Sequence, residues 1–306
     1  MNKQLLLKLH RWISLVFALP LLIIIATGLI LAFQPIAQVA AIKPQSVDAI
    51  RVVELIRQYD PDGKARGLSI DASTQHITLQ GAAVSEIDLT TGAPTASPIM
   101  SKVFLWARLA HEHLIVLSWL VIASTMAMIV VMCMGILMGL PRLRNTLSGW
   151  HKGAAWFTLP LILLSPLTGL CMALGLTFQS GGAPAAGKRV SLPEAVSIIA
   201  RDHDVSQVNS IGNRGGRMMA RIFEGDELRA YAVSADGIAA LPRNWPRLLH
   251  EGNWSLLGSA ANVLISAVLL SLLVTGVLIW ARRRLRRPSR QRDVQANDSA
   301  AVSAAR

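Results

Sequence analysis

Charged residues are scarce in this chain. Only 16% of its 306 residues are Asp, Glu, Lys or Arg, against 52% that are hydrophobic. Four long hydrophobic runs contain none of these charged residues, and they are Trp12–Phe33, Leu114–Leu140, Ala154–Leu176 and Leu257–Ala281. A helix needs about 20 apolar residues to cross a bilayer. The composition therefore excludes an ordinary globular enzyme and predicts four transmembrane helices.

Cysteine is also scarce, and nucleotide-binding motifs are lacking. The chain has two cysteines, Cys133 and Cys171, and both lie inside hydrophobic runs. We interpret them as small buried hydrophobic residues and not as metal ligands or a disulfide. No glycine-rich nucleotide fingerprint or flavin-type domain is recognisable, so any redox function needs a separate electron donor. The absence of acidic and basic residues inside the runs argues against a transporter.

Positive charge is concentrated beside the hydrophobic runs. The formal net charge is +12. Three basic segments flank the runs, and they are Lys3–Arg11, Arg142–Lys152 and Arg282–Arg287. Because basic loops stay in the cytoplasm, both termini are expected to be cytoplasmic and the two long loops, roughly 35–110 and 177–256, to lie on the far side. We interpret this charge as a signal for topology and for lipid head-group contact, and not for nucleic-acid binding.

The sequence repeats itself with a period of about 140 residues. Thr27-Gly28 follows His10 at the same spacing as Thr168-Gly169 follows His151. The second and fourth runs are preceded by related strings, Arg108-Leu109-Ala110-His111-Glu112 and Arg247-Leu248-Leu249-His250-Glu251. The unit is a helix, an external loop and a second helix, and it is used twice in the same orientation.

Each external loop is predicted to form a small α+β module. In the first loop, the helical spacing of Val47–Ile56 is followed by three strand-like stretches, 67–71, 76–80 and 84–89. In the second loop, a capping box begins a helix near Leu192–Ala200, because Ser191 is followed by Glu194 three residues later. Three strand-like stretches follow it, and they are 208–211, 218–223 and 228–233.

Several motifs resemble the PepSY-associated transmembrane helix family. They are the Leu-His-Arg-Trp opening at Leu9–Trp12, the Thr-Gly pairs, the Leu-His-Glu-Gly string at Leu249–Gly252 and Val274–Trp280. The resemblance covers about residues 5–287. It implies an iron-regulated, multi-pass protein of the bacterial inner membrane that is similar to ferrisiderophore reductases. Such members carry haem between their helices and pass electrons to a ferric chelate in the periplasm.

With this resemblance, the sequence predicts an all-α membrane core of four transmembrane helices in a two-fold repeat, with two small α+β, PepSY-like periplasmic modules. The expected segments are transmembrane helix 1 (1–34), periplasmic module 1 (35–110), transmembrane helix 2 (111–140), a cytoplasmic loop (141–150), transmembrane helix 3 (151–176), periplasmic module 2 (177–249), transmembrane helix 4 (250–282) and a basic, disordered cytoplasmic tail (283–306).

Histidines are placed at the start of all four hydrophobic segments, which favours two axial pairs for haem b. His10 and His151 belong to outward-running helices and are expected near the cytoplasmic face, whereas His111 and His250 are expected near the periplasmic face. The equivalent positions in the repeat pair His10 with His151 and His111 with His250. Iron held by two imidazoles passes single electrons and has no open position for oxygen.

Two alternatives remain open for these histidines. All four can be interfacial residues at head-group level that bind nothing. In addition, His113 competes with His111 as a ligand, since residues two apart on a helix point in nearly opposite directions. The match to the string around His250 favours His111. Glu112 and Glu251 either hydrogen-bond near the haem or form solvated helix starts.

Two functions follow from these observations. The first is electron transfer from quinol or a cytoplasmic reductase, through two haems, to a periplasmic ferric siderophore or another ferric chelate. The second is a non-redox binding or regulatory protein, whose external modules bind a partner while the helices only anchor them in membrane lipid. A haem absorption band in the purified protein distinguishes these two functions.

Overall fold

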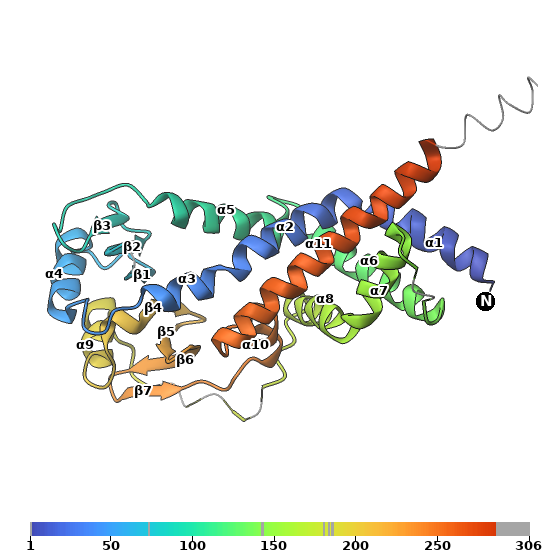
Figure 1. Ribbon diagram of the computed structural model, residues 1–306. Helices are drawn as coiled ribbons and strands as arrows, with labels where there is room; N and C mark the ends of the chain where they lie inside the picture. Colours follow the sequence, from blue (N-terminus) through green and yellow to red (C-terminus); the bar gives the residue numbers. More distant parts are fainter. Residues whose placement is uncertain are drawn as a thin grey trace, which may run out of the picture. The chain divides into compact units, whose positions relative to one another are not determined.

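The computed structural model describes residues 2–72, 74–141, 144–179, 181–182, 184 and 187–285 (Figure 1). Arg142 and all but the first three residues of the predicted tail, 283–306, lie outside the described residues. The chain divides into two compact units. The helical unit comprises Met1–Ala26, His111–Leu167 and Ile265–Arg306, and the sheet unit comprises Thr27–Ala110 and Thr168–Leu264.

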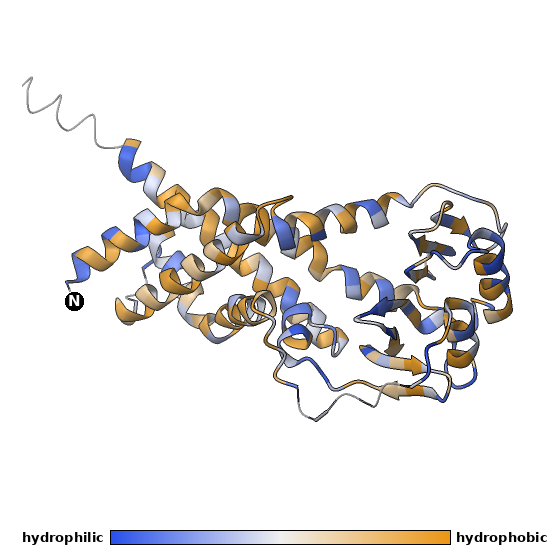
Figure 2. Ribbon diagram, turned by 180° about the vertical axis from the view of Figure 1, so that it is seen from behind, coloured by the Kyte–Doolittle hydropathy of each residue, from blue (hydrophilic) through white to orange (hydrophobic). Residues whose placement is uncertain are grey.

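The helical unit is a membrane-type bundle. Three helical stretches in the described residues are long and apolar enough to cross a membrane, and they are Ala18–Ala41, Ser118–Leu137 and Leu256–Leu285. A fourth candidate is the bent pair α7 (Leu147–Phe157) and α8 (Leu159–Ala173). The long helices are mainly orange in Figure 2, whereas the strands mix orange and blue. Aliphatic side chains form the core of this unit, and they are Leu21, Ile25, Ile162, Ile265 and Leu269.

The first and third hydrophobic runs are not the continuous helices that the sequence predicts. Helix α1 (Lys3–Val16) ends before Phe17, and α2 (Ala18–Ala32) begins after it. The axes of α7 and α8 differ by 68° across a break at Thr158. Pro20 and Pro160 follow these two breaks, and a proline ring clashes with the carbonyl group four residues earlier. Each break lies seven residues after a histidine, His10 in one case and His151 in the other.

The second and fourth runs also begin differently from the prediction. His111 lies in the last turn of α5 (Ile99–His113), and the span α6 (Ser118–Leu137) starts only after a break. Leu114 and Ile115 in this break have φ values of 39° and 72°, which a helix cannot accommodate. His250 lies in α10 (Trp245–Glu251), which ends at the left-handed Gly252 before α11 (Leu256–Leu285). The histidines therefore lie on short helices that precede the spans.

The sheet unit contains one antiparallel sheet of seven strands in the order β3-β2-β1-β4-β5-β6-β7. The first external loop supplies β1 (Gly67–Asp71), β2 (His76–Gln80) and β3 (Glu86–Asp88). The second supplies β4 (Val208–Arg214), β5 (Arg217–Glu224), β6 (Glu227–Ser234) and β7 (Gly237–Ala240). The sequence predicts two separate modules, but β1 pairs with β4 and joins them in one sheet.

The joint between β1 and β4 depends on a close approach of two backbones. Gly67 pairs with Gly212 across the joint. A Cβ atom on Gly67 would lie 2.9 Å from the carbonyl oxygen of Ile211, which is too short for a normal contact. The pairing satisfies backbone groups that separate modules would leave at exposed edges.

Two helices cover the sheet and bury a common core. They are α4 (Ala49–Tyr59) and α9 (Leu192–Ile199), which contact each other and lie side by side in Figure 1. The capping box predicted at Ser191 and Glu194 is present at the start of α9. Fully buried aliphatic residues from both loops form the core, and they include Leu55, Ile56, Leu68, Ile77, Ile199 and Ile222. The sequence did not predict α3 (Gln34–Ala41) or β7.

Candidate functional site

His111 is oriented by the backbone of α2. Its Nδ1 atom lies 2.8 Å from the carbonyl oxygen of Ile24. A carbonyl oxygen can only accept a hydrogen bond, so Nδ1 of His111 must be the protonated nitrogen. In the neutral imidazole, Nε2 then carries the lone pair that a metal ligand needs.

His151 is oriented in the same way by α11. Its Nδ1 atom lies 2.8 Å from Oγ1 of Thr275. The hydroxyl group of Thr275 donates its only proton to the carbonyl oxygen of Ser271, at 2.7 Å, and can therefore only accept from His151. Nδ1 is again assigned as the donor and Nε2 as the nitrogen with the lone pair.

His250 lies against α8 in the sheet unit. Its Nδ1 atom is 3.2 Å from Oγ1 of Thr168. The next residue, Gly169, leaves room for the ring, because a Cβ atom there would lie 2.9 Å from Cε1 of His250. At His151, the corresponding glycine is Gly276, where a Cβ atom would lie 3.5 Å from the ring. Each of these imidazoles therefore rests on a Thr-Gly pair from another helix.

His10 and His151 belong to the same unit and lie near each other. His10 is half-buried on α1, and the two imidazoles are close enough to interact electrostatically. His111 and His250 belong to different units, each of which is described by itself. Their pairing therefore stays a prediction from the sequence repeat.

His113 has different surroundings from His111. Its side chain is 47% exposed, and its Nδ1 atom lies 2.9 Å from Oγ of Ser118 at the start of α6. His111, two residues earlier on the same helix, is half-buried and contacts the backbone of α2. This difference favours His111 over His113 as the ligand.

The Thr-Gly pairs were identified in the sequence, but their contacts with the histidines were not. In the structure, Thr275-Gly276 and Thr168-Gly169 lie against His151 and His250. The identical spacing from histidine to Thr-Gly was the available signal. It did not identify the contacts, because the partner histidine lies on another helix.

Arginines surround Glu251, next to His250. Nη2 of Arg221 lies 3.1 Å from Oε2 of Glu251, and Nη1 of Arg247 lies 3.0 Å from Oε1. Nδ2 of Asn253 donates to Oε2 of Glu251 at 2.6 Å. Burial alone would raise the pKa of Glu251, but Arg221, Arg247 and Arg108 outweigh it and hold this pKa below its usual range. Glu251 is therefore a half-buried, ionised residue at the end of α10 and not a solvated helix start.

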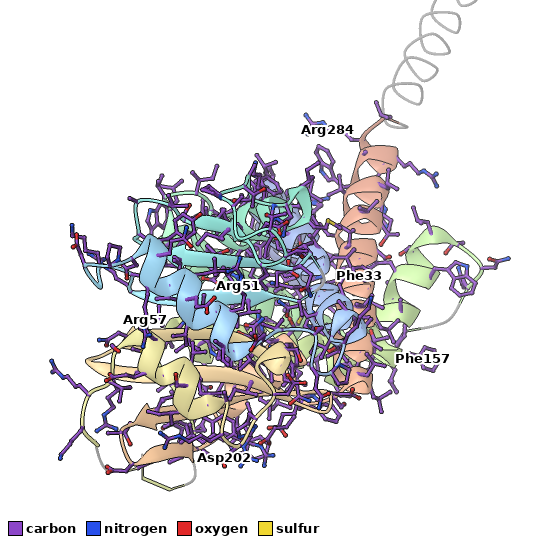
Figure 3. The ribbon with its side chains drawn as sticks, turned by 90° about the vertical axis from the view of Figure 1, so that its left-hand side faces the viewer. Phe33, Arg51, Arg57, Phe157, Asp202 and Arg284 are labelled. Atoms are coloured by element: carbon purple, nitrogen blue, oxygen red, sulfur yellow. The ribbon has the colours of Figure 1, made fainter. Side chains whose placement is uncertain are left out.

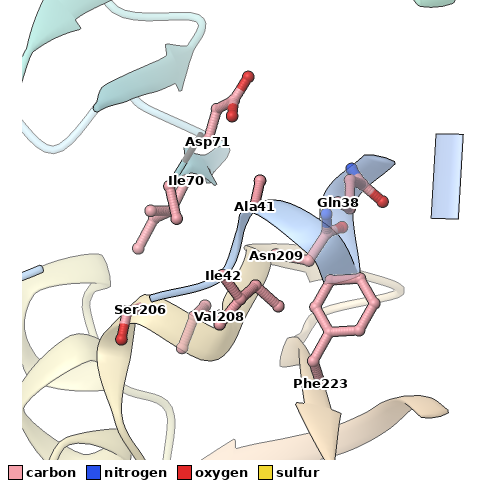
Figure 4. Close-up of a pocket in the computed structure, with 10 residues that line it drawn as sticks. Gln38, Ala41, Ile42, Ile70, Asp71, Ser206, Val208, Asn209 and Phe223 are labelled. Carbon is pink, nitrogen blue, oxygen red and sulfur yellow. The ribbon is translucent and has the colours of Figure 1, made fainter. Parts of the chain in front are cut away.

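The sheet unit has two further depressions. A pocket of about 30 Å³ lies between α3, β1 and β4, with Ile70 and Phe223 among its lining residues (Figure 4). This volume holds about one water molecule. A larger groove of about 790 Å³ is lined by both loops and by the basic residues Arg57, Lys64 and Arg66. Arg57 extends from α4 in Figure 3.

Within the described residues, no group of three or more His, Cys, Asp or Glu side chains is arranged to hold a metal ion. Haem needs only two axial imidazoles.

Phe157, at the break between α7 and α8, is 80% exposed and projects away from its helix (Figure 3). This exposure suits contact with lipid.

The chain was compared with known proteins. No curated protein matches it. A family model described as PepSY-associated TM region matches residues 7–283, which is most of the chain. This chain therefore belongs to the PepSY-associated TM region family.

Proposed function

We propose that this membrane protein is a haem-containing electron carrier that reduces a ferric chelate. The protein lies in the inner membrane of a bacterium. It receives electrons from quinol or from a cytoplasmic reductase and passes them to a ferric siderophore, or to another ferric chelate, in the periplasm. The family assignment and the resemblance to ferrisiderophore reductases support this choice. Haem-dependent ferric reductase is the corresponding enzyme class.

The observation that carries the proposal is the common orientation of three imidazoles. Nδ1 of His111, His151 and His250 lies within 3.2 Å of an oxygen atom from another helix. Histidines that hold a metal usually donate their other ring N–H to such an oxygen, which fixes the ring and increases its basicity. The exposed His113 also has an oxygen near Nδ1, Oγ of Ser118 at 2.9 Å, whereas His111, His151 and His250 are half-buried beside theirs.

The proposed ligands form two pairs. His10 and His151 hold one haem b, and His111 and His250 hold the other. The first pair is supported by the proximity of its members, and the second by the sequence repeat. When bound, each bis-histidine haem supplies a one-electron carrier with no open iron position.

The groups of this protein have three tasks in the proposed function. The imidazoles hold iron through Nε2, the threonine and carbonyl oxygens orient them, and the apolar helices exclude water. In the overall reaction, one electron from the donor reduces Fe(III) in the chelate to Fe(II). Hard oxygen ligands hold Fe(II) less tightly, so reduction releases the iron.

Absorption spectroscopy tests this proposal. Protein purified from haem-replete cells should be red and show a Soret band that shifts when dithionite is added. His10→Ala and His250→Ala should each remove about half of this band, because each breaks one of the two bis-histidine sites. His113→Ala is the matched control, since this exposed residue precedes the same span as His111, and it should leave the band unchanged. Colourless wild-type protein would refute the proposal.

The basic groove favours a second candidate function. Its volume of about 790 Å³ suits a small ligand, and Arg57, Lys64 and Arg66 favour an anionic one. A membrane-anchored PepSY protein that binds such a ligand without redox chemistry would be colourless. It would also bind that ligand after all four histidines are replaced.

A further inference from the structure

Arginine side chains gather around the turn that carries His250. Arg247 lies one turn before His250 on α10, and Arg221 reaches the same place from β5. Both hold the carboxylate of Glu251, at 3.0 Å and 3.1 Å. Arg108, on α5, is close enough to act electrostatically on Arg221 and Glu251. Arg108, Arg221 and Arg247 all belong to the sheet unit, and we call them the arginine cluster.

The arginine cluster can bind a further anion. Arg221 and Arg247 share the single carboxylate of Glu251, so one carboxylate balances two guanidinium groups. Each guanidinium has five N–H donors, and each uses one of them on Glu251. The side chains of Arg221 and Arg247 keep 25% and 41% of their surface exposed. Donors and positive charge therefore stay accessible.

The position of the arginine cluster relates it to the proposed haem ligand. Arg247 lies three residues before His250, and Arg108 lies three residues before His111. Residues three apart on a helix share a face. Both halves of the chain therefore have an arginine three residues before a proposed ligand.

We infer that Arg221 and Arg247, with Arg108 beside them, bind the propionate carboxylates of the haem held by His250. This inference rests on the proposed function. The two propionates of haem lie on one edge of the ring and are anionic, so they are costly to bury in the apolar part of the bilayer. Guanidinium groups match the planar geometry of carboxylates and bind them with two parallel hydrogen bonds. The arginine cluster would thereby supply the positive charge and the N–H donors that this polar edge needs.

A comparison of haem with its dimethyl ester tests the inference. The ester has the same ring and iron but lacks the propionate charges. The full-length His10→Ala protein isolates the site at His250, and its haem-free form is titrated with either compound while the Soret band is recorded. The ester should bind about tenfold more weakly than haem, as expected for the loss of a charge-assisted hydrogen bond.

Arginine variants then test whether the arginine cluster causes the difference in affinity between haem and its ester. In Arg221→Gln/Arg247→Gln, haem and its ester should bind with nearly equal affinity. This variant leaves the half-buried carboxylate of Glu251 without its two arginine partners. The variant Arg221→Gln/Arg247→Gln/Glu251→Gln, which removes that charge as well, is therefore measured beside it. Arg243→Gln is the matched control, because Arg243 is an exposed arginine of the same unit that pairs with Glu227. It should keep the full difference between the two compounds.

The outcomes separate this inference from the proposed function. If the unmodified protein binds neither compound, the proposed function fails. If haem and its ester bind equally well to the His10→Ala protein, or if the arginine variants keep the difference, haem binding stands and the arginine cluster has no role in it. Retention of an anionic phospholipid by native mass spectrometry, lost in the arginine variants while the haem and ester affinities stay equal, would also overturn the inference and assign the cluster to lipid head groups.

Discussion

The two halves of the chain share a sequence pattern but hold their histidines with different groups. In the first half, a backbone carbonyl of α2 accepts from His111. In the second half, threonine hydroxyls of α8 and α11 contact His250 and His151. In these three histidines the constant feature is an oxygen at Nδ1, and the variable feature is the residue that supplies it. This difference indicates that the orientation of the ring matters more than the identity of its partner.

The Thr-Gly pairs provide the strongest test of this comparison. Gly169→Ala should weaken haem binding about tenfold, because its new Cβ atom would lie 2.9 Å from the ring of His250 and displace it. Gly276→Ala should have little effect on haem binding, since a Cβ atom there would lie at an ordinary 3.5 Å from His151. Haem titration and thermal unfolding measure both variants.

The pair of glycine variants has an internal control. Alanine favours a helix over glycine by about 1 kcal/mol, so Gly276→Ala should unfold at an equal or higher temperature than the unmodified protein. Equal haem affinity in the two variants would mean that Gly169 does not hold His250 in place.

The joint between the halves predicts the next largest effect. Gly67→Ala should destabilise the sheet by about 1–3 kcal/mol, because its Cβ atom would lie 2.9 Å from the carbonyl oxygen of Ile211. Gly212→Ala should cost less, since its nearest neighbour, the carbonyl oxygen of Arg66, would lie at 3.3 Å. Hydrogen exchange of amides in β1 and β4 measures the joint directly. Unchanged exchange in Gly67→Ala would contradict the close approach.

The threonine partners should have a smaller effect. Thr275→Val removes the acceptor at Nδ1 of His151 and should cost about 1 kcal/mol of haem binding. Loss of this hydrogen bond makes the ring less basic, so the reduction potential of the haem should become more positive. Thr168→Val should act in the same direction but less strongly, since its contact with His250 is longer, 3.2 Å against 2.8 Å. A redox titration that gives unchanged potentials for both variants would argue against ligation.

The smallest expected effect concerns the two tyrosines, one in each half of the chain, and the pH dependence of stability. Tyr59 donates to the carbonyl oxygen of Gly92, at 2.8 Å, whereas Tyr231 donates to the carboxylate of Glu224. Burial, together with this hydrogen bond, raises the pKa of Tyr231 to about 12. The pKa of a tyrosine in an unfolded chain is about 10, so this contribution to stability is complete below pH 10 and is lost as the pH rises through 12.

Ultraviolet absorption at alkaline pH checks the prediction for Tyr231. In Tyr59→Phe, Tyr231 is the remaining tyrosine, and its ionisation should be centred near pH 12. A Glu224→Gln substitution should move this midpoint toward lower pH, because it removes a carboxylate that favours the neutral phenol. An unchanged midpoint would show that Glu224 does not act on Tyr231.

Much of the fold follows from local sequence patterns. Hydrophobic length identified the membrane segments, and alternation placed β1 and β2 at the residues where the structure has them. The capping box located the start of α9. These features depend on residues that are close together in the chain, so they can be predicted from a single sequence. The breaks at Phe17 and Thr158 had a signal in Pro20 and Pro160, but the length of the apolar runs concealed it.

The joined sheet and the partners of the histidines could not be predicted in this way. The pairing of Gly67 with Gly212 links strands that are far apart in the sequence. The contact of His151 with Thr275 likewise depends on which helices pack together. The sequence repeat relates residues of the two halves to each other, but such a relation does not specify which residues are in contact.

The number of haems per chain tests the central claim most directly. A pyridine haemochrome assay on protein purified from haem-replete cells should give two haem b per chain, and one in either His10→Ala or His250→Ala. This result would support two separate sites built from the two halves of the chain. Purified, folded protein without haem would contradict the account.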